Sequence, residues 1–273
     1  MNIDNPRKIA FEQLKESLNP EKWKKNSQFI SEIKKDLLKH PINNHPIIKL
    51  LNKGVFNHAE MQKIHLEYRH AIVKIFTDAL LMTQFQTKQL EPRFPAGIKM
   101  IPRFLITLNI LDEFGFSPGF DSNEYYQGNP NYAHYPLFEK LLDHYKLTDN
   151  DRNNYKPSDI SNKLKSFLEA TYDDYLLLAA LLATAEIEVM LFSPPLMQNT
   201  KELDIDTTQG YYYFHGSSEE ADTDAYDDDH EDDLWNILIH AIEPKDYQYV
   251  KSHCLEYCDL WVSFWDYQLG KHS

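Results

Sequence analysis

Three short clusters of acidic and histidine residues in this 273-residue chain could bind metal ions. In LEYRH, Glu67 and His70 lie three residues apart, so on a helix both side chains leave the same face. An E-x-x-H pair of this kind supplies ligands to carboxylate-bridged di-iron sites in helical bundles. Carboxylate oxygens can bridge and neutralise two cations, while imidazole adds a nitrogen donor. Taken alone, the pair is more simply explained as part of an exposed helix surface.

The second cluster is the pair Glu186 and Glu188, in LLATAEIEVMLF at the end of the most apolar segment of the chain. On a helix the two side chains point about 200° apart, so at most one of them should face the interior. A buried carboxylate without a partner costs several kcal/mol, so an inward glutamate requires a cation or a raised pKa. The alternative is that both lie on an exposed stripe where the helix leaves the core.

The third cluster lies in YYYFHGSSEEADTDAYDDDHEDDLW, residues 211–235, where Asp227 and His230 form a D-x-x-H pair. Further back along the same helical face lie Thr223, Asp222, Glu219 and His215. A solvated acidic surface is the alternative, but the DLWNILIHAI that follows predicts a packed segment. Three helices that each offer a carboxylate, two of them with a histidine, suit a di-metal carboxylate site.

The elements that would position these residues are helices. The chain has only eight glycines, and its apolar residues recur at spacings of three and four, which predicts an all-α protein. We expect a single bundle of about seven to nine helices in one domain, with no linker that would divide it. Helices are expected at about 6–18, 21–39, 47–54, 57–86, 98–114, 134–145, 159–192, 208–240 and 244–269. Residues 116–132 are predicted to form a loop. The SPPL that follows residue 192 is predicted to end the 159–192 helix.

Composition excludes several classes of function. The net charge of −14 disfavours nucleic acid and anionic membranes as partners. Cys254 and Cys258 are the only cysteines, and we interpret them as two buried thiols. The N-terminus lacks the apolar core of a signal peptide, and no apolar run reaches the roughly 18 residues of a membrane helix. The expected location is cytoplasmic, and the expected partner is a small-molecule substrate.

Several segments resemble the TenA/PqqC-like, haem-oxygenase-like superfamily. HPIIKLLNKGVFNHAEMQKIHLEYRHAI resembles its opening helices, and LNILDEFGF with NYAHYPLFEKLL resembles a segment of its iron-containing redox enzymes. DDDHEDDLW resembles their metal-binding helix. The resemblance covers residues 36–268, which leaves 1–35 as an N-terminal helical extension.

The resemblance implies a non-haem di-iron oxidase or oxygenase. Two Fe(II) ions would activate O2 to oxidise a small organic acid or amine by N-oxygenation, C–C cleavage or decarboxylation. The implied ligands are Glu67, His70, Glu188, Asp227 and His230, with Glu186, His215 and Glu219 as alternates. Arg69 and Arg103 could hold a substrate carboxylate, although structural ion pairs are the simpler explanation for both. Homodimers are usual for this superfamily.

One departure from the family pattern affects the second iron. The family's last helix reads H-x-x-x-D-x-x-H, but this chain has Thr223 at the first histidine position. His215 could replace that nitrogen ligand across an insertion or helical bulge, or Glu219 and Asp222 could supply oxygens. The second iron site could also be weak or empty. Asp112, Glu113 and His134 match family positions too, and we expect them to tie the loop after their helix.

Two other functions compete with the di-iron hypothesis. A metal-free relative on the same fold would be a binding protein or a thiamin-salvage-like hydrolase, which uses a core cysteine that neither Cys254 nor Cys258 matches in position. A haem-degrading enzyme would need a proximal histidine. His40 and His45 are available, but each adjoins a proline in a predicted loop.

Overall fold

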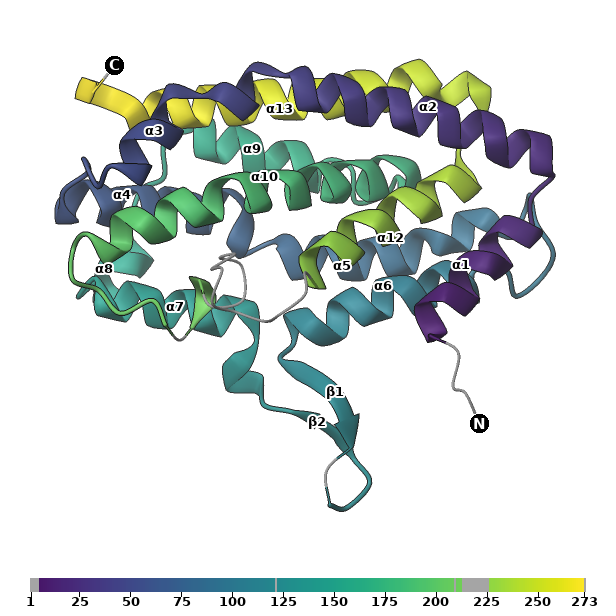
Figure 1. Cartoon of the computed structure of the whole chain (residues 1–273), viewed down its shortest axis with the longest axis horizontal. Helices are drawn as coiled ribbons and strands as arrows, with labels where there is room; N and C mark the ends of the chain where they lie inside the picture. Colours follow the sequence, from purple (N-terminus) through teal and green to yellow (C-terminus); the bar gives the residue numbers. More distant parts are fainter. Residues whose placement is uncertain (1–4, 121, 209, 213–225, 273) are drawn as a thin grey trace.

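A computed structural model describes residues 5–120, 122–208, 210–212 and 226–272. For residues 226–229 and Lys271 it describes the backbone only. The described chain is a helical bundle with one small β-hairpin, which confirms the predicted all-α class (Figure 1). The helices in the N-terminal half are α1 (Pro6–Glu16), α2 (Pro20–Lys39), α3 (Pro46–Asn52), α4 (His58–Tyr68), α5 (Phe76–Gln86) and α6 (Met100–Glu113). In the C-terminal half they are α7 (His134–His144), α8 (Asp149–Asn154), α9 (Asp159–Glu169), α10 (Tyr175–Lys201), α12 (Tyr226–Ala241) and α13 (Tyr247–Leu269).

Short tight turns join several of these helices. Segments of 3₁₀-helix lie at Pro41–Asn44, Thr87–Leu90, Pro130–Tyr132, Pro244–Asp246 and Gly270–His272. The local start and stop signals act as the sequence predicts. Asn57 and Glu60 form a complete capping box at the start of α4. Gly54, with φ of +63°, follows the last turn of α3, where a side chain would be strained.

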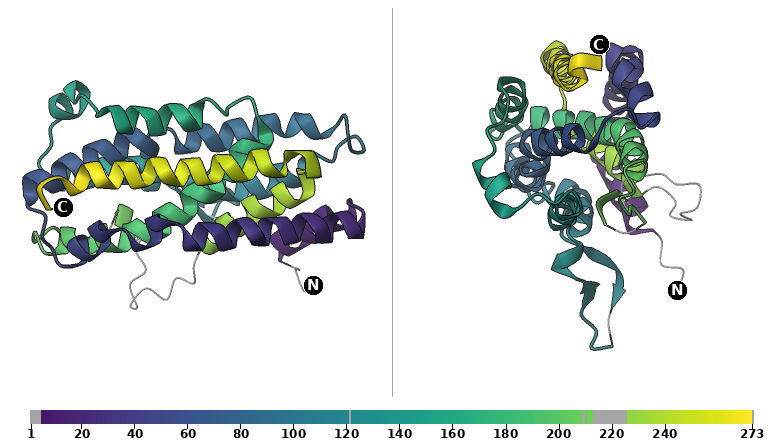
Figure 2. Two further views of the ribbon diagram at one scale, coloured as in Figure 1. Left: turned by 90° about the horizontal axis from the view of Figure 1, so that it is seen from above. Right: turned by 90° about the vertical axis from the view of Figure 1, so that its left-hand side faces the viewer.

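Helix α10 runs through the middle of the bundle. It packs against α12, α13, α3 and α5, so its neighbours come from several sides (Figure 2). By length and composition α10 could cross a membrane, but 78% of its most apolar window is buried inside the protein. Because nearly every face of α10 meets another helix, both Glu186 and Glu188 are buried. The prediction that at most one of them faces the interior is therefore wrong.

Three predicted helix boundaries also differ from the structure. Asp174 begins α10 as an N-cap, so the predicted 159–192 helix is two helices, α9 and α10. Pro194 and Pro195 lie inside α10, which continues to Lys201. Packing of α10 against its neighbours outweighs the loss of two backbone hydrogen bonds at these prolines. The predicted 57–86 helix is interrupted by a π-helical segment, Arg69–Val73, between α4 and α5.

A β-hairpin replaces most of the predicted 116–132 loop. Strands β1 (Phe116–Phe120) and β2 (Tyr126–Gly128) are antiparallel, with Phe116 opposite Gly128 and Phe120 opposite Tyr126. The Asn129 amide donates to the Gly115 carbonyl at 2.9 Å, which closes the base of the hairpin. Gly115 has a φ of +79°, and a Cβ there would lie 2.5 Å from the Asn129 carbonyl oxygen. Only glycine fits this turn.

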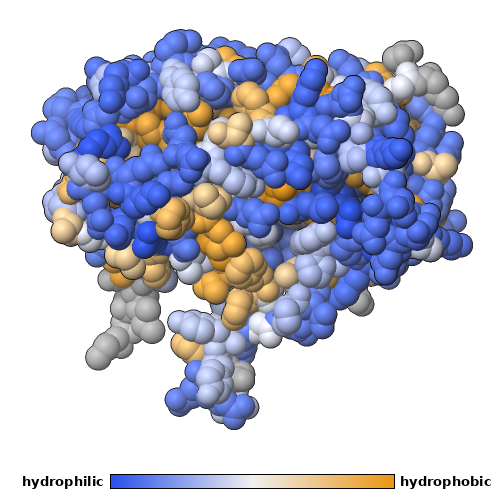
Figure 3. Space-filling model, turned by 180° about the vertical axis from the view of Figure 1, so that it is seen from behind, coloured by the Kyte–Doolittle hydropathy of each residue, from blue (hydrophilic) through white to orange (hydrophobic). Residues whose placement is uncertain are grey.

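The hairpin projects from the bundle beside an apolar surface. Seen from behind, apolar side chains gather above the hairpin (Figure 3). Exposed large apolar side chains of α5, α6 and the hairpin include Leu81, Phe85, Met100, Phe104, Phe116 and Phe120. The core lies on the other side of these helices, where buried side chains from α1 through α13 form one continuous cluster.

Candidate functional site

Glu67 and His70 share a helix face, as their spacing predicts, but that face meets α9. The Glu67 side chain is 1% exposed, and its carboxylate accepts hydrogen bonds at the N-terminus of α9. The donors are the Tyr155 hydroxyl at 2.5 Å, the Ser158 amide at 3.1 Å, the Ser158 hydroxyl at 2.8 Å and the Ser161 hydroxyl. Four donors fill the four acceptor directions of a carboxylate. Glu67 therefore caps α9.

His70 lies one turn further on, at the start of the π-helical segment. Its Nε2 is 2.9 Å from Asn162 Oδ1 on α9, and its ring is half-buried. Burial lowers the pKa of His70, with the Asn162 contact opposing that shift. The pair Glu67 and His70 thus joins α4 to α9. It does not turn toward Glu188.

Glu188 lies in an aromatic part of the core between α4 and α13. The Tyr68 hydroxyl is 3.0 Å from Oε2, and the Trp265 indole nitrogen is 3.1 Å from Oε1. Burial raises the pKa of Glu188 to about 8, although both hydrogen bonds act in the opposite direction. The carboxyl group is therefore mostly protonated at neutral pH. The cavity beside it, which Thr184, Cys258 and Trp261 also line, has a volume of ≈ 10 Å³. That is room for about one water molecule.

Glu186 contacts α6, whereas Glu188 contacts α4 and α13. Glu186 is 4% exposed, and its Oε1 accepts a hydrogen bond from Asn109 Nδ2 on α6 at 3.2 Å. His230 is buried on α12, which packs against both α10 and α6. Asn109 Oδ1 is buried and has no hydrogen-bond partner among the described residues. Two ligand-type side chains and an unused amide oxygen therefore belong to the three helices that meet here.

The other predicted ligands lie wholly or partly outside the described residues. The backbone of Asp227 lies in α12, but its side chain is outside the described residues, as are His215 and Glu219 in full. The same holds for Asp222 and Thr223. Among the side chains that the structure describes, no three His, Cys, Asp or Glu residues are grouped to hold a metal ion. Among the described side chains, Glu67, His70 and Glu188 therefore have separate hydrogen-bond partners and are not grouped around one point.

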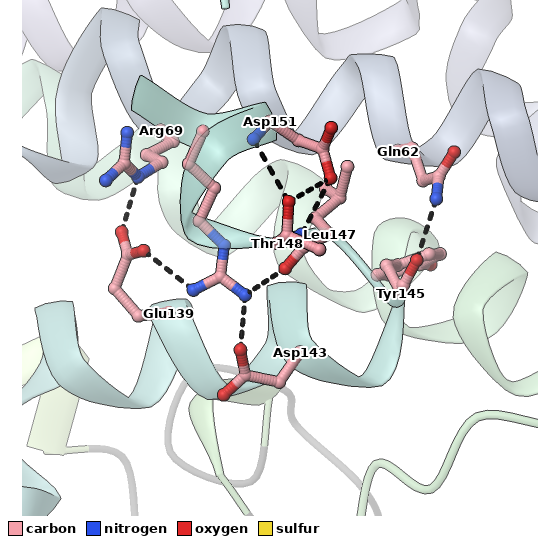
Figure 4. Close-up of polar contacts among 9 residues, drawn as sticks. Gln62, Arg69, Glu139, Asp143, Tyr145, Leu147, Thr148 and Asp151 are labelled. Carbon is pink, nitrogen blue, oxygen red and sulfur yellow. Dashed lines mark hydrogen bonds and ion pairs between the residues drawn. The ribbon is translucent and has the colours of Figure 1, made fainter. Parts of the chain in front are cut away.

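The two arginines expected to bind a substrate carboxylate have structural partners. Arg69 pairs with Glu139 on α7 and lies 3.2 Å from the Tyr135 hydroxyl. Glu139 also pairs with Arg152 at 3.1 Å, so one network joins the π-helical segment, α7 and α8 (Figure 4). Arg103 Nε donates to the Gln84 carbonyl and the Thr87 hydroxyl at the end of α5. These contacts match the structural explanation for both arginines.

Other polar residues singled out in the sequence also join elements. His134 Nδ1 is 2.9 Å from Glu113 Oε1, and this contact ties the start of α7 to the end of α6. His40 and His45 are buried, and each has Nε2 3.1 Å from an aspartate of α13, Asp259 and Asp266 respectively. The two histidines thus hold the connection between α2 and α3 onto α13.

Both cysteines lie on α13 and are buried. Burial raises the pKa of Cys254 to about 12 and that of Cys258 further above its usual value. Both thiols are therefore protonated near neutral pH. Since the thiolate is the nucleophilic form, neither cysteine is prepared for covalent catalysis.

A cavity that the sequence did not predict lies between α7 and residues 206–208 and 210–212. Its volume is ≈ 490 Å³. The apolar walls are formed by Leu137, Leu141, Tyr211 and Tyr212. The polar groups on its lining include Lys140, His144, Asp206 and Thr207. A volume of this size and a mixed lining are typical of a site for a small organic molecule.

Behind the cavity wall, Tyr212 is hydrogen-bonded to His65 of α4. His65 Nδ1 lies 2.7 Å from the Met61 carbonyl, which can only accept, so Nδ1 carries the proton. His65 Nε2 is therefore the acceptor for the Tyr212 hydroxyl at 2.6 Å. Burial lowers the pKa of His65 to about 4, so the imidazole is neutral at neutral pH. The pair fixes the position of Tyr212 in the wall. Since 147 positions separate the two residues, helix periodicity gave no sign of it.

Comparison with known proteins supports the fold. No protein-family model matches the chain, and no curated protein sequence matches it. Among solved structures, the chain is similar to a TenA homolog from Pseudomonas syringae pv. tomato str. DC3000. The TM-score is 0.61 at 12% sequence identity, over 89% of this chain and 91% of that one. The protein therefore has a TenA-like helical fold.

Proposed function

We propose that this protein binds a small organic molecule in the cavity between α7 and residues 206–208 and 210–212. This is the metal-free hypothesis for a TenA-like chain. The observation that supports it is the ≈ 490 Å³ cavity itself, with leucine and tyrosine walls and a few polar groups. Ligand sites of small molecules have this size and composition. A role in binding is favoured over cysteine-based hydrolysis, because both thiols are buried and protonated.

Filling the cavity tests this proposal. Leu141→Trp places a larger side chain on the α7 wall, and Thr208→Trp does so from the exposed opposite side. We expect compounds that bind the wild type in a fragment screen by ligand-observed NMR to lose at least about tenfold in affinity in both variants. Because Leu141 is buried and its replacement could disturb folding, Thr208→Trp is the second variant, with circular dichroism as a check of fold.

The control is Leu38→Trp, which adds an indole at an exposed position of α2. It should leave every fragment affinity unchanged. If fragments bind Leu141→Trp, Thr208→Trp and wild type equally, the cavity is not the binding site and the proposal is wrong.

We propose iron binding at the meeting point of α6, α10 and α12 as a second candidate. The unpartnered Asn109 Oδ1 beside Glu186, with buried His230 on the adjoining helix, supports it. Iron held there would supply redox chemistry with O2, as the resemblance implies. This site uses Glu186 and His230 from the predicted ligand set, whereas Glu67, His70 and Glu188 have hydrogen-bond partners on other elements.

The iron content of matched variants shows whether Glu186 and His230, and not His70, hold the iron. After anaerobic loading with Fe(II) and desalting, elemental analysis should find iron in the wild type and in His70→Ala. The iron content should fall several-fold in Glu186→Ala and His230→Ala, because each variant loses a ligand. Equal iron in all four proteins, or none above background in the wild type, would remove this candidate.

A further inference from the structure

The polar groups of the cavity differ in what they can offer a ligand. Thr207 is 5% exposed and lines the cavity, and its Oγ1 is buried without a hydrogen-bond partner among the described residues. A buried hydroxyl without a partner costs about 1–3 kcal/mol. Such a group in a cavity wall points to a ligand that supplies the missing hydrogen bond.

Lys140 provides a positive charge on the same cavity. Its ammonium group donates to the Asn131 carbonyl at 3.0 Å, which uses one of its three donors. The Lys140 side chain is exposed on α7 and has no carboxylate partner within ion-pair distance among the described residues. The ammonium also lies 6.0 Å from the centroid of the Tyr132 ring, and two of its donors remain for a ligand.

Asp206 is the opposing charge on the lining. Its Oδ1 accepts from the Thr208 amide at 2.9 Å and from the Thr208 hydroxyl at 2.7 Å. These two bonds are the main cause of its lowered pKa, and they engage Oδ1 within its own turn. His144, one helical turn after Lys140, lies near enough to Asp206 to contribute to that shift. One of the two Asp206 oxygens is thus engaged by Thr208, whereas the Thr207 hydroxyl has no partner among the described residues.

The walls favour an apolar body on the same ligand. Leu137 and Leu141 of α7 are buried, and Tyr211 and Tyr212 line the same cavity. Tyr212 is held by His65, and the Tyr211 ring packs edge-on against Phe138 with ring centroids 4.8 Å apart. Aromatic and leucine surfaces in fixed positions suit a flat or chain-like apolar group.

We infer that the ligand of this cavity is a carboxylic acid with an apolar or aromatic body. Its carboxylate would pair with the Lys140 ammonium and accept a hydrogen bond from the Thr207 hydroxyl. Leu137, Leu141, Tyr211 and Tyr212 would enclose the body. This inference rests on the proposed function and adds the chemical class of the ligand to it.

Three compounds with the same phenylpropyl body provide the test: 3-phenylpropionate, 3-phenylpropanamide and 3-phenylpropylamine. Their dissociation constants are measured by titration calorimetry at pH 7 with the full chain. We expect the carboxylate to bind at least tenfold more tightly than the amide, since charge-assisted hydrogen bonds are the stronger kind. The amine should bind most weakly.

Two conservative variants assign the effect to residues. Lys140→Met keeps the length of the apolar stem and removes the charge, and it should weaken the carboxylate about tenfold or more while leaving the amide unchanged. Thr207→Val keeps the side-chain shape and should weaken the carboxylate about three- to tenfold. Lys165→Met, on α9 and away from the cavity lining, is the matched control and should change neither compound.

Each other outcome has a definite meaning. Equal affinity for the carboxylate and the amide, lost in Thr208→Trp, overturns the ligand class and leaves the proposed function in place. Tightest binding of the amine overturns it too, because Asp206 would then dominate recognition. If none of the three compounds binds, but the NMR screen still finds fragments whose binding is lost in Thr208→Trp, the ligand class is wrong and the proposed function stands. If the NMR screen also finds no fragment that binds in the cavity, the proposed function is wrong as well.

Discussion

Replacing Glu67 with alanine should lower the free energy of unfolding by about 3–5 kcal/mol, the largest loss we expect from any single predicted ligand. The substitution leaves the Ser158 amide and the hydroxyls of Tyr155, Ser158 and Ser161 without their common acceptor. These groups are part-buried or buried, so water replaces the carboxylate incompletely. The N-terminus of α9 also loses the negative charge that the helix dipole favours.

Urea unfolding monitored by circular dichroism measures this loss, and the wild type and variant are compared in the presence of a chelator. The chelator matters because a metal ligand would stabilise only the loaded protein. Glu256→Ala, at an exposed position of α13, is the control and should change stability by less than about 0.5 kcal/mol. A Glu67→Ala loss that vanishes in the chelator would show that Glu67 acts through a metal and would contradict the capping role.

Wild-type stability should fall as the pH rises from about 5 to 8 relative to Glu188→Gln. The pKa of Glu188 is raised from 4.5 to about 8 by burial, so the folded state holds this proton more tightly than the unfolded state does. The stabilisation is fully present below pH 4.5 and is lost as the pH rises through 8. Between those values the free energy of unfolding should fall by about 1.4 kcal/mol per pH unit from this group.

Glu188→Gln should remove that slope without losing the contacts. The glutamine oxygen can accept from the Trp265 indole, and its amide can donate to the Tyr68 hydroxyl, as a protonated carboxyl group would. We therefore expect the stability difference between Glu188→Gln and wild type to grow by roughly 4 kcal/mol between pH 5 and 8 in favour of glutamine.

Urea unfolding at a series of pH values measures this difference, with Glu256→Gln on the surface of α13 as the control. The control should follow the wild-type curve at every pH. Parallel curves for wild type and Glu188→Gln would mean that Glu188 has an ordinary pKa, and our account of its burial would then be wrong.

The sequence by itself determined the helical class and many of the helix ends. Both are local properties, because apolar spacing sets which face of a helix can be buried. The capping box of Asn57 and Glu60 and the glycine at position 54 act within a few residues of their own helices. The shared face of Glu67 and His70 was predicted correctly for the same reason, since it depends only on the geometry of one helical turn.

Only the tertiary structure decided what those faces meet. The Glu67 and His70 face lies against serine and asparagine side chains of α9, so the pair caps and joins helices. The helices around α10 bury both Glu186 and Glu188. Their packing also stabilises the helical conformation of α10 at Pro194 and Pro195. Burial and partners of this kind come from segments far away in the chain, which the pattern of one helix cannot specify.

The candidate binding site depends on tertiary structure for the same reason. Its cavity lies between α7 and residues 206–208 and 210–212, which are distant in sequence. The shape of such a cavity depends on how these separate segments pack against each other. His65 and Tyr212 fix one wall across 147 positions of chain. Residue types and spacing determined that this protein is a helical bundle with buried polar groups. Long-range packing decided which of those groups stabilise helices and which face a cavity that can hold a ligand.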